Sequence, residues 1–144
     1  MAKKVSFEQQ VYTYDIDYAG HVSNLVYLRW METARTKLLE AAGKPVQELL
    51  REGIVPILAG TSIEYKKPIL LDDRVRVEIW LSRMRGVTAR IEVRFFDGDG
   101  RLAASGWHRW VFINAETQRP LRLPPALRSA LEPFLEEAEG GRGE

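Results

Sequence analysis

The sequence of 144 residues contains no cysteine, only two histidines and no marked excess of either charge. Without cysteine the chain can form no disulfide, no thiol nucleophile and no thiolate metal site. A zinc site would have to depend on carboxylates, so we expect no bound metal. The formal net charge is +1, and the basic residues are interleaved with acidic ones, so nucleic acid is not an expected partner.

Long hydrophobic runs are also absent. No apolar stretch approaches the roughly 18 to 20 residues of a membrane span, and no apolar segment follows Lys3 and Lys4 as it would in a signal peptide. We therefore expect a cytoplasmic protein with no membrane span. The composition, 45% hydrophobic and 28% charged, is that of one globular domain over residues 1–138. The glycine-rich residues 139–144 are expected to form a disordered tail.

One segment has the strongest helical pattern in the chain. Its apolar residues recur at three- and four-residue steps, and they are Tyr27, Trp30, Met31, Ala34, Leu38 and Ala42. Ser23 or Asn24 can cap the N-terminus, and Gly43 followed by Pro45 supplies a stop. The pattern predicts one long helix from about Asn24 to Ala42.

Several other segments have the composition or the alternation of strands. They are Val5–Tyr14, the second half of Ile54–Tyr65, Val75–Leu81, Val87–Phe95 and Leu102–Ile113. Short turns, marked by Gly86 and by residues 97–100, make neighbouring strands antiparallel. A short helical turn at residues 46–52 and a C-terminal helix from Ala126 to about Ala138 complete the prediction. The long helix must bury its apolar stripe against the one sheet, which predicts an α+β fold with a curved antiparallel sheet of about five strands wrapped around a central helix.

Residues 15–24 hold the densest group of chemically useful side chains, between the first strand and the long helix. Two carboxylates and a histidine precede the helix start. The free N–H groups and the dipole of a helix N-terminus can stabilise an oxyanion, and a nearby carboxylate can act as a general base or a nucleophile. From the residues alone, a polar surface connection would look the same.

A set of residues that together form one recognisable pattern is spread over much of the chain. They are Tyr14, Asp15, Asp17, Gly20, Val22, Asn24, Tyr27, Glu32, Ala34, Arg35 and Gly43, followed by Tyr65, Pro68, Asp72, Asp73, Arg119, Pro120, Leu123 and Pro124. This pattern resembles that of the hotdog-fold acyl-CoA thioesterases of the 4-hydroxybenzoyl-CoA thioesterase-like family. The order of the predicted elements is similar too. The resemblance covers nearly the whole chain and is specific for the family rather than for a substrate.

Carried over by position, the resemblance makes Asp17 the catalytic carboxylate and Asp15 a structural residue. The backbone N–H of Asn24 then polarises the thioester carbonyl, and Tyr27 shapes the substrate pocket. Asp17 either attacks the carbonyl or activates water, and the resemblance does not decide between the two.

Three further positions are candidates with two interpretations each. His21, where several family members carry a hydrophobic residue, either orients water or hydrogen-bonds Asp17, or is an ordinary loop histidine. Arg83 and Arg85 resemble the position where the family places basic residues against the phosphates of coenzyme A, but a solvated hairpin end would have the same composition. Arginine suits a phosphate because its planar guanidinium donates two hydrogen bonds.

Other conspicuous side chains are expected to be structural. His108 is expected to lie on one face of the sheet, because it falls within a predicted strand. Glu32 and Arg35 are three residues apart, which favours a salt bridge on one helix face. The tryptophans are expected in the core or at an interface, and they are Trp30, Trp80, Trp107 and Trp110.

The resemblance implies a hydrolase that converts an acyl thioester to a free acid and coenzyme A. Coenzyme A is then part of the substrate, and no other cofactor is expected. It also implies a homo-oligomer, a dimer or tetramer, with sites at subunit boundaries. The acyl group, and the choice between coenzyme A and an acyl carrier protein, stay open. Two alternatives are a hydratase or dehydratase that uses Asp17 with His21, and a non-catalytic acyl-CoA binding module.

Overall fold

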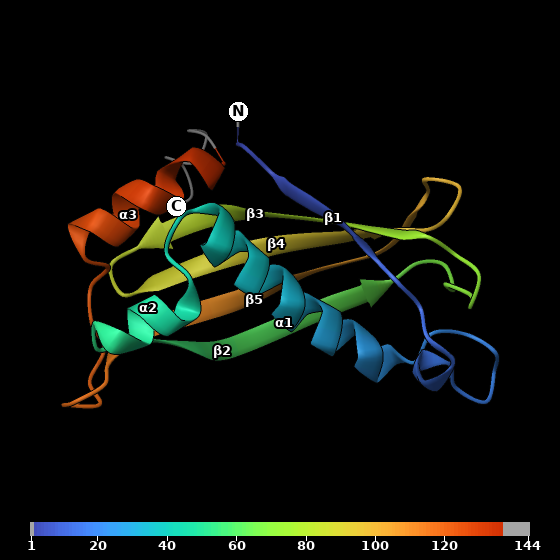
Figure 1. Cartoon of the computed structure of the whole chain (residues 1–144), viewed down its shortest axis with the longest axis horizontal. Helices are drawn as coiled ribbons and strands as arrows, with labels where there is room; N and C mark the ends of the chain where they lie inside the picture. The colour runs from blue at the N-terminus through green and yellow to red at the C-terminus, as the bar shows by residue number, and fades with distance from the viewer. Residues whose placement is uncertain (1, 137–144) are drawn as a thin grey trace.

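The computed structural model describes residues 2–136, which form one antiparallel sheet with a long helix lying across one of its faces (Figure 1). The strands are β1 (Val5–Gln9), β2 (Ile54–Tyr65), β3 (Val75–Arg85), β4 (Thr88–Phe96) and β5 (Leu102–Asn114). The helices are α1 (Asn24–Ala41), α2 (Val46–Arg51) and α3 (Pro125–Leu131), with 3₁₀ turns η1 (Thr13–Asp15) and η2 (Glu132–Phe134). The predicted α+β architecture is confirmed.

The five strands lie in the order β1-β3-β4-β5-β2, and all neighbours are antiparallel. The turns at Gly86 and at residues 97–100 join β3 to β4 and β4 to β5, as the sequence predicts. The edge strand β2 follows α1 and α2 in the chain but pairs with β5, the last strand. The long crossover brings the end of β2, at Tyr65, to the first residue of α1, where the candidate site lies.

The core lies between α1 and the sheet. α1 buries the face predicted from its periodicity, with the exception of Ala42, which lies beyond its end, and the buried residues are Val26, Tyr27, Trp30, Met31, Ala34, Leu38 and Leu39. Alternate residues of β4 face this helix, and Ile91, Val93 and Phe95 are at most 1% exposed. Packing of this stripe against the sheet supplies the main hydrophobic stabilisation of the fold.

Within residues 2–136 the other sheet face carries no helix, and long charged side chains cover it. Trp80 lies on this face but is only 5% exposed, because Lys4 and Arg94 stack on its ring at 4.3 and 5.0 Å from the centroid. Arg90 stacks on Trp107 in the same way, at 4.6 Å. The apolar stems and cations shield the aromatic rings from water while their charged ends stay solvated.

Three strands have a boundary several residues away from the predicted one. β1 ends at Gln9 instead of Tyr14, because the Asp15 carboxylate accepts a hydrogen bond from the Tyr12 amide at 2.8 Å and the chain turns into η1. β2 includes the whole of Ile54–Tyr65 and not only its second half, and β3 continues to Arg85.

The C-terminal helix is shorter than predicted. α3 ends at Leu131, and the chain tightens into η2, which contains Pro133. Proline has no N–H to continue the α-helical hydrogen-bond ladder. The last residues of the predicted helix and the predicted tail at 139–144 lie outside the described residues. No helix within residues 2–136 has the length and apolarity needed to span a bilayer.

Candidate active site

The loop between η1 and α1 folds back on itself at residues 16–22. Ile16 and Val22 form an antiparallel bridge, and the Asp17 N–H donates to the His21 carbonyl at 2.8 Å. Gly20 has a φ of +82°, a conformation that glycine adopts without steric cost. The Val22 N–H then donates to the Ile69 carbonyl at 2.8 Å, which ties the loop to the segment after β2.

This turn fixes the Asp17 carboxylate through one of its two oxygens. Oδ1 accepts hydrogen bonds from the main-chain N–H groups of Ala19 at 2.9 Å and His21 at 3.3 Å. Oδ2 accepts no hydrogen bond from any group in residues 2–136. The side chain is thus held by its own loop and keeps one oxygen available.

The N-terminus of α1 presents one unpaired amide beside this carboxylate. Ser23 is the N-cap, and its Oγ accepts from the Leu25 N–H at 3.3 Å while its carbonyl accepts from the Val26 N–H at 2.9 Å. The Asn24 N–H donates no hydrogen bond within the described part of the chain. An unpaired amide at the positive end of an 18-residue helix is suited to bind a carbonyl oxygen that gains negative charge.

Asp17 and Asn24 line the same cavity, of about 240 Å³. Its remaining walls come from the loop before α1, from α1, from the end of β2 and from the segment that follows it, and they are His21, Val22, Tyr27, Tyr65, Lys66, Lys67 and Pro68. The structure therefore brings together four of the predicted site residues, Asp17, His21, Asn24 and Tyr27. The His21 side chain is exposed, and its ring makes no hydrogen bond within residues 2–136, so it contacts the Asp17 carboxylate through its main-chain amide only.

Two tyrosines form the aromatic wall of the cavity, Tyr27 and Tyr65. Their ring centroids lie 5.2 Å apart at an interplanar angle of 73°. The Tyr65 hydroxyl donates to the Asn24 carbonyl at 3.1 Å. Burial raises the pKa of Tyr27 well above its usual value, with smaller contributions from Tyr65 and Asp73, and burial also raises the pKa of Tyr65. Both phenols are therefore protonated donors at neutral pH.

Sequence reasoning missed the contribution of the β2 end to this site. Tyr65 and Pro68 belong to the family pattern, but nothing in the sequence marks them, or Lys66 and Lys67, as site residues. The sequence gives little indication that these residues belong to the site, because they lie some 40 positions after the helix start. Only the pairing of β2 with β5 places them against Asn24.

Arg83 and Arg85 lie far from the cavity within one chain. They end β3, whose first residue, Val75, follows the loop nearest the site. Ten residues at about 3.3 Å each put Arg85 roughly 30 Å along the strand from Val75. Figure 1 shows the start of α1 and the end of β3 at opposite ends of the molecule.

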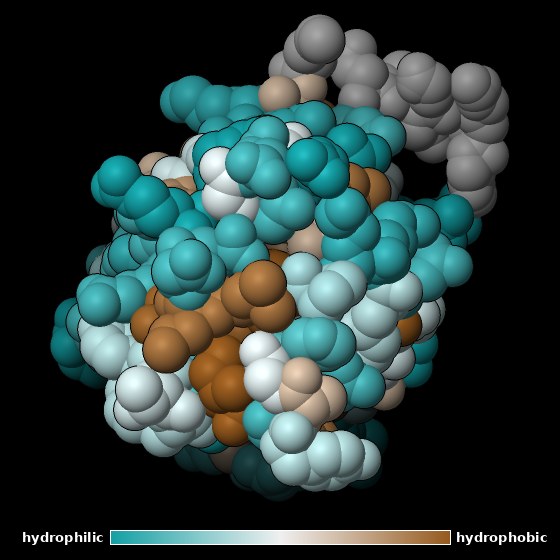
Figure 2. Space-filling model, turned by 90° about the vertical axis from the view of Figure 1, so that its right-hand side faces the viewer, coloured by the Kyte–Doolittle hydropathy of each residue, from teal (hydrophilic) through white to brown (hydrophobic). Residues whose placement is uncertain are grey.

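The end of the molecule that holds the cavity is also partly apolar. Figure 2 views the protein from this end and shows hydrophobic residues gathered at its middle, surrounded by hydrophilic ones. The exposed leucines at the helix start and in the loop after β2 are Leu25 at 74%, Leu70 at 45% and Leu71 at 47%.

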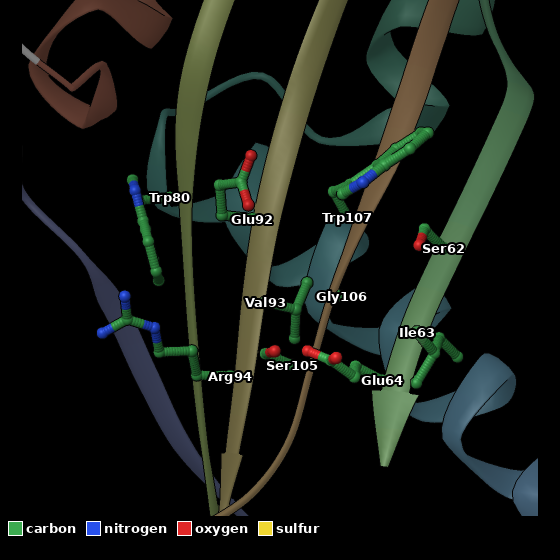
Figure 3. Close-up of a pocket in the computed structure, with 10 residues that line it drawn as sticks. All are labelled: Ser62, Ile63, Glu64, Trp80, Glu92, Val93, Arg94, Ser105, Gly106 and Trp107. Carbon is green, nitrogen blue, oxygen red and sulfur yellow. The ribbon is translucent and has the colours of Figure 1, made fainter. Parts of the chain in front are cut away.

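A second hollow, of about 500 Å³, lies on the sheet face away from α1 (Figure 3). Trp80, Glu92 and Trp107 form one cross-strand row in it. The Glu92 carboxylate already accepts from the Ser82 hydroxyl at 2.6 Å and from Arg90 at 2.8 Å. Because its central carboxylate is paired, this larger hollow offers less for catalysis than the cavity at Asp17.

The one buried histidine belongs to the core. His108 is 2% exposed and faces α1, where its Nδ1 lies 3.4 Å from the Arg35 guanidinium. Burial, with the charge of Arg35, lowers the pKa of His108 to about 4. Arg35 also contacts Glu32 at 3.6 Å, which confirms the predicted salt bridge. Among residues 2–136 no three histidine or acidic side chains cluster in a way that could hold a metal ion.

The fold and the carboxylate beside a helix N-terminus define a hotdog-fold protein of the thioesterase class. A family model described as the thioesterase-like superfamily matches residues 11–131. The chain belongs to this family, as the sequence predicted, and is a hydrolase that acts on thioester bonds.

Individual relatives agree with this assignment. The long-chain acyl-CoA thioesterase FadM of Escherichia coli (strain K12) is 28% identical over 123 residues, which cover 85% of this chain and 92% of FadM. A thioesterase from Thermus thermophilus, solved with coenzyme A and zinc, is 29% identical with a TM-score of 0.76 over 90% of this chain and 92% of that one. A DHNA-CoA thioesterase from Staphylococcus aureus, at 22% identity, shares the fold with a TM-score of 0.83 over 91% of this chain and 88% of that chain.

Proposed function

We propose that this protein hydrolyses acyl-CoA thioesters to the free acid and coenzyme A, and that the Asp17 carboxylate carries the reaction. The observation behind the proposal is that one cavity is lined both by Asp17, whose Oδ2 is unpaired within residues 2–136, and by Asn24, whose N–H is unpaired there too. A thioester carbonyl needs both groups: one to attack its carbon and one to stabilise the negative charge that develops on its oxygen.

In the proposed mechanism the thioester oxygen accepts a hydrogen bond from the Asn24 N–H at the positive end of α1. Asp17 Oδ2 then acts by one of two routes. As a nucleophile it forms a mixed anhydride and expels the coenzyme A thiolate, and water later cleaves the anhydride. As a general base it takes a proton from water, whose oxygen attacks the carbonyl; the C–S bond then breaks, and the coenzyme A thiolate takes up the proton. Both routes give an acid and a thiol.

The two amides on Oδ1 support either route. They hold Oδ1 in the loop and so orient the carboxylate, which leaves Oδ2 to act on the carbonyl or on water. Neither route needs a cofactor, because coenzyme A is the leaving group. The Escherichia coli relative is named an acyl-CoA thioesterase, and the Thermus thermophilus thioesterase was solved with coenzyme A. Both names favour coenzyme A over a carrier protein as the thiol.

We further propose that the working form is a homo-oligomer, a dimer or a tetramer. The predicted phosphate ligands Arg83 and Arg85 lie at the far end of β3, so in this account they contact coenzyme A bound at the Asp17 cavity of a neighbouring copy. The edge strand β2 leaves backbone groups open to pairing and exposes Ile57 and Leu58, each at 43%. Light scattering with size-exclusion chromatography tests the proposal, which a monomer at assay concentrations contradicts.

The function is tested by thiol release from a panel of acyl-CoA esters, from acetyl through long-chain acyl to benzoyl and hydroxyphenylacetyl. The protein contains no cysteine, so a thiol reagent reports only coenzyme A. Turnover of at least one ester by the purified protein is the expected result. Esters that bind but stay intact would favour a binding module. Hydration of an acyl double bond, or its formation, without thiol release would favour a hydratase or dehydratase.

A further inference from the structure

The Tyr27 hydroxyl is a buried hydrogen-bond donor for which the described chain provides no acceptor. The residue is 2% exposed, and its hydroxyl makes no hydrogen bond within residues 2–136. Buried tyrosine hydroxyls usually find a partner, and an unsatisfied one calls for an explanation. Because Tyr27 lines the cavity that contains Asp17 and Asn24, a bound substrate can supply the missing acceptor.

Three aromatic contacts hold the Tyr27 ring in place. Its centroid lies 5.5 Å from that of Trp30, 5.2 Å from Tyr65 and 5.2 Å from Phe95, all edge to face. A ring packed on three sides cannot swing out to hydrogen-bond water. The hydroxyl is therefore presented at a fixed position, as preorganised catalytic donors are.

Nearby acceptors in the described chain accept from other donors, and none of them accepts from Tyr27. The Asp73 carboxylate is close enough to raise the pKa of Tyr27, but its oxygens accept from the Leu70 amide at 2.8 Å and the Gly98 amide at 3.1 Å. The Asn24 carbonyl accepts from the Tyr65 hydroxyl. The raised pKa keeps Tyr27 protonated at neutral pH, so the group is a donor there.

The position of Tyr27 on α1 directs it toward the helix start. It is three residues after Asn24, about 4.5 Å along the axis at a rise of about 1.5 Å per residue. Side chains on a helix point back toward its N-terminus, over the preceding turn. The phenol consequently extends over the turn that begins with Asn24, whose N–H is the proposed carbonyl donor.

We infer that the Tyr27 hydroxyl is a second hydrogen-bond donor to the thioester carbonyl oxygen, beside the Asn24 N–H. This inference rests on the proposed function, since it concerns the same reacting atom. The hydroxyl stabilises the oxygen as negative charge develops on it, and the two donors converge from the backbone and from a side chain of one helical turn. Tyr27 is then a catalytic residue and not only a wall of the pocket.

Binding of two unreactive substrate analogues tests the inference without turnover. In the first, methylene replaces the thioester sulfur, so the carbonyl is kept as a ketone. In the second, methylene replaces the carbonyl, which leaves a thioether. Tyr27→Phe removes only the hydroxyl and is expected to weaken binding of the ketone roughly 10-fold, in line with the loss of one buried hydrogen bond, while binding of the thioether changes less than 2-fold, by about 0.4 kcal/mol.

Kinetics and a matched variant complete the test. Tyr27→Phe is expected to lower kcat/KM roughly 10- to 100-fold, because the donor contacts the carbonyl oxygen in the bound ester and more strongly in the transition state. Tyr14→Phe is the control, since Tyr14 is 75% exposed and lies outside the cavity, and it should behave as the wild type in both assays. Urea unfolding of each variant confirms that the fold is retained.

The inference is overturned if Tyr27→Phe binds the ketone as tightly as the wild type does, or if it loses affinity for both analogues equally, which is the signature of a changed pocket shape. Failure of the proposed function looks different. In that case the wild type releases no thiol from any ester, whatever residue stands at position 27.

Discussion

The hydroxyl of Tyr65 donates a hydrogen bond to the main-chain carbonyl of Asn24 over 3.1 Å, and so ties the end of the edge strand β2 to the first residue of α1. The two residues are 41 positions apart in the chain. This contact holds the helix start, where a carbonyl oxygen is proposed to bind, against the part of the cavity wall that Tyr65 forms.

Tyr65→Phe is therefore expected to lower kcat several-fold while changing stability by no more than about 1 kcal/mol. The ring still packs on Tyr27, and the lost bond is partly exposed, so water can satisfy the Asn24 carbonyl. Steady-state kinetics and urea unfolding measure the two effects. Unchanged kcat would show that the contact does not position the helix start for catalysis.

Replacing Asp15 is expected to lower stability, whereas replacing Asp17 is expected to leave stability nearly unchanged. Asp15 is 3% exposed, and its carboxylate accepts from the Tyr12 amide at 2.8 Å. Asp15→Ala leaves that amide without its partner and should lower the free energy of unfolding by about 1–3 kcal/mol. Asp17→Ala removes only hydrogen bonds within an exposed turn and should cost less than about 1 kcal/mol. Urea unfolding of both variants decides, and an Asp17 variant less stable than the Asp15 variant would reverse the assignment of roles.

A glycine in β5, Gly106, leaves room for the backbone of the neighbouring strand β2 and for a side chain of α1. A Cβ on Gly106 would lie 2.4 Å from the Ser62 carbonyl oxygen and 3.2 Å from Cε of Met31. Gly106→Ala must displace backbone and is expected to destabilise the protein by about 1–3 kcal/mol. At Gly60 an added Cβ meets only the flexible end of the Arg109 side chain, so Gly60→Ala is the matched control and should cost much less. Thermal or urea unfolding compares them, and equal losses would contradict the packing argument.

The buried His108 makes stability depend on pH. Its pKa is about 4 in the folded protein against 6.5 for the ordinary side chain. Between these values the unfolded state binds the proton and the folded state does not, so stability is fully present above about pH 6.5 and is lost as the pH falls toward 4. At about 1.4 kcal/mol per pKa unit the loss amounts to about 3 kcal/mol.

The measurement is the free energy of unfolding from pH 7.5 to 4, for the wild type and for His108→Gln. The variant should be less stable at pH 7.5, because it disturbs the core contact with Arg35, and should show a shallower dependence on pH. Parallel curves for the two proteins would mean that another group is responsible for the acid sensitivity.

Much of this fold could be predicted from local patterns. The period of α1, the alternation of β3 and β4 and the glycine turns are properties of neighbouring residues, and the structure confirms them. The end of β1 could not be placed, because residues Tyr12–Tyr14 have strand composition and only the Asp15 side chain turns them into η1. The last helix was predicted too long because the prediction gave no weight to Pro133, which lacks an N–H and ends the α-helical hydrogen bonding at η2.

The candidate site, too, could be predicted only in part, where its residues are close together in the sequence. Asp17, His21 and Asn24 are close in sequence, and their meeting in one cavity follows from a strand–loop–helix order that the sequence made visible. Tyr65 and its neighbours enter the cavity through long-range pairing of β2, which no local pattern encodes. The isolation of Arg83 and Arg85 from the cavity likewise depends on the direction of β3 across the sheet.

The most direct test of the central claim compares Asp17→Asn with the wild type on the best ester of the panel, at saturating concentration. The amide keeps the size of the side chain and an oxygen for the two loop amides. It removes the negative charge that the carboxylate needs to attack the carbonyl carbon or to take a proton from water. The account predicts that kcat falls by at least about 100-fold while the ester still binds, in the range lost when a general base or nucleophile is removed. An Asp17→Asn variant that releases thiol at close to the wild-type rate would contradict the claim that Asp17 carries the hydrolysis.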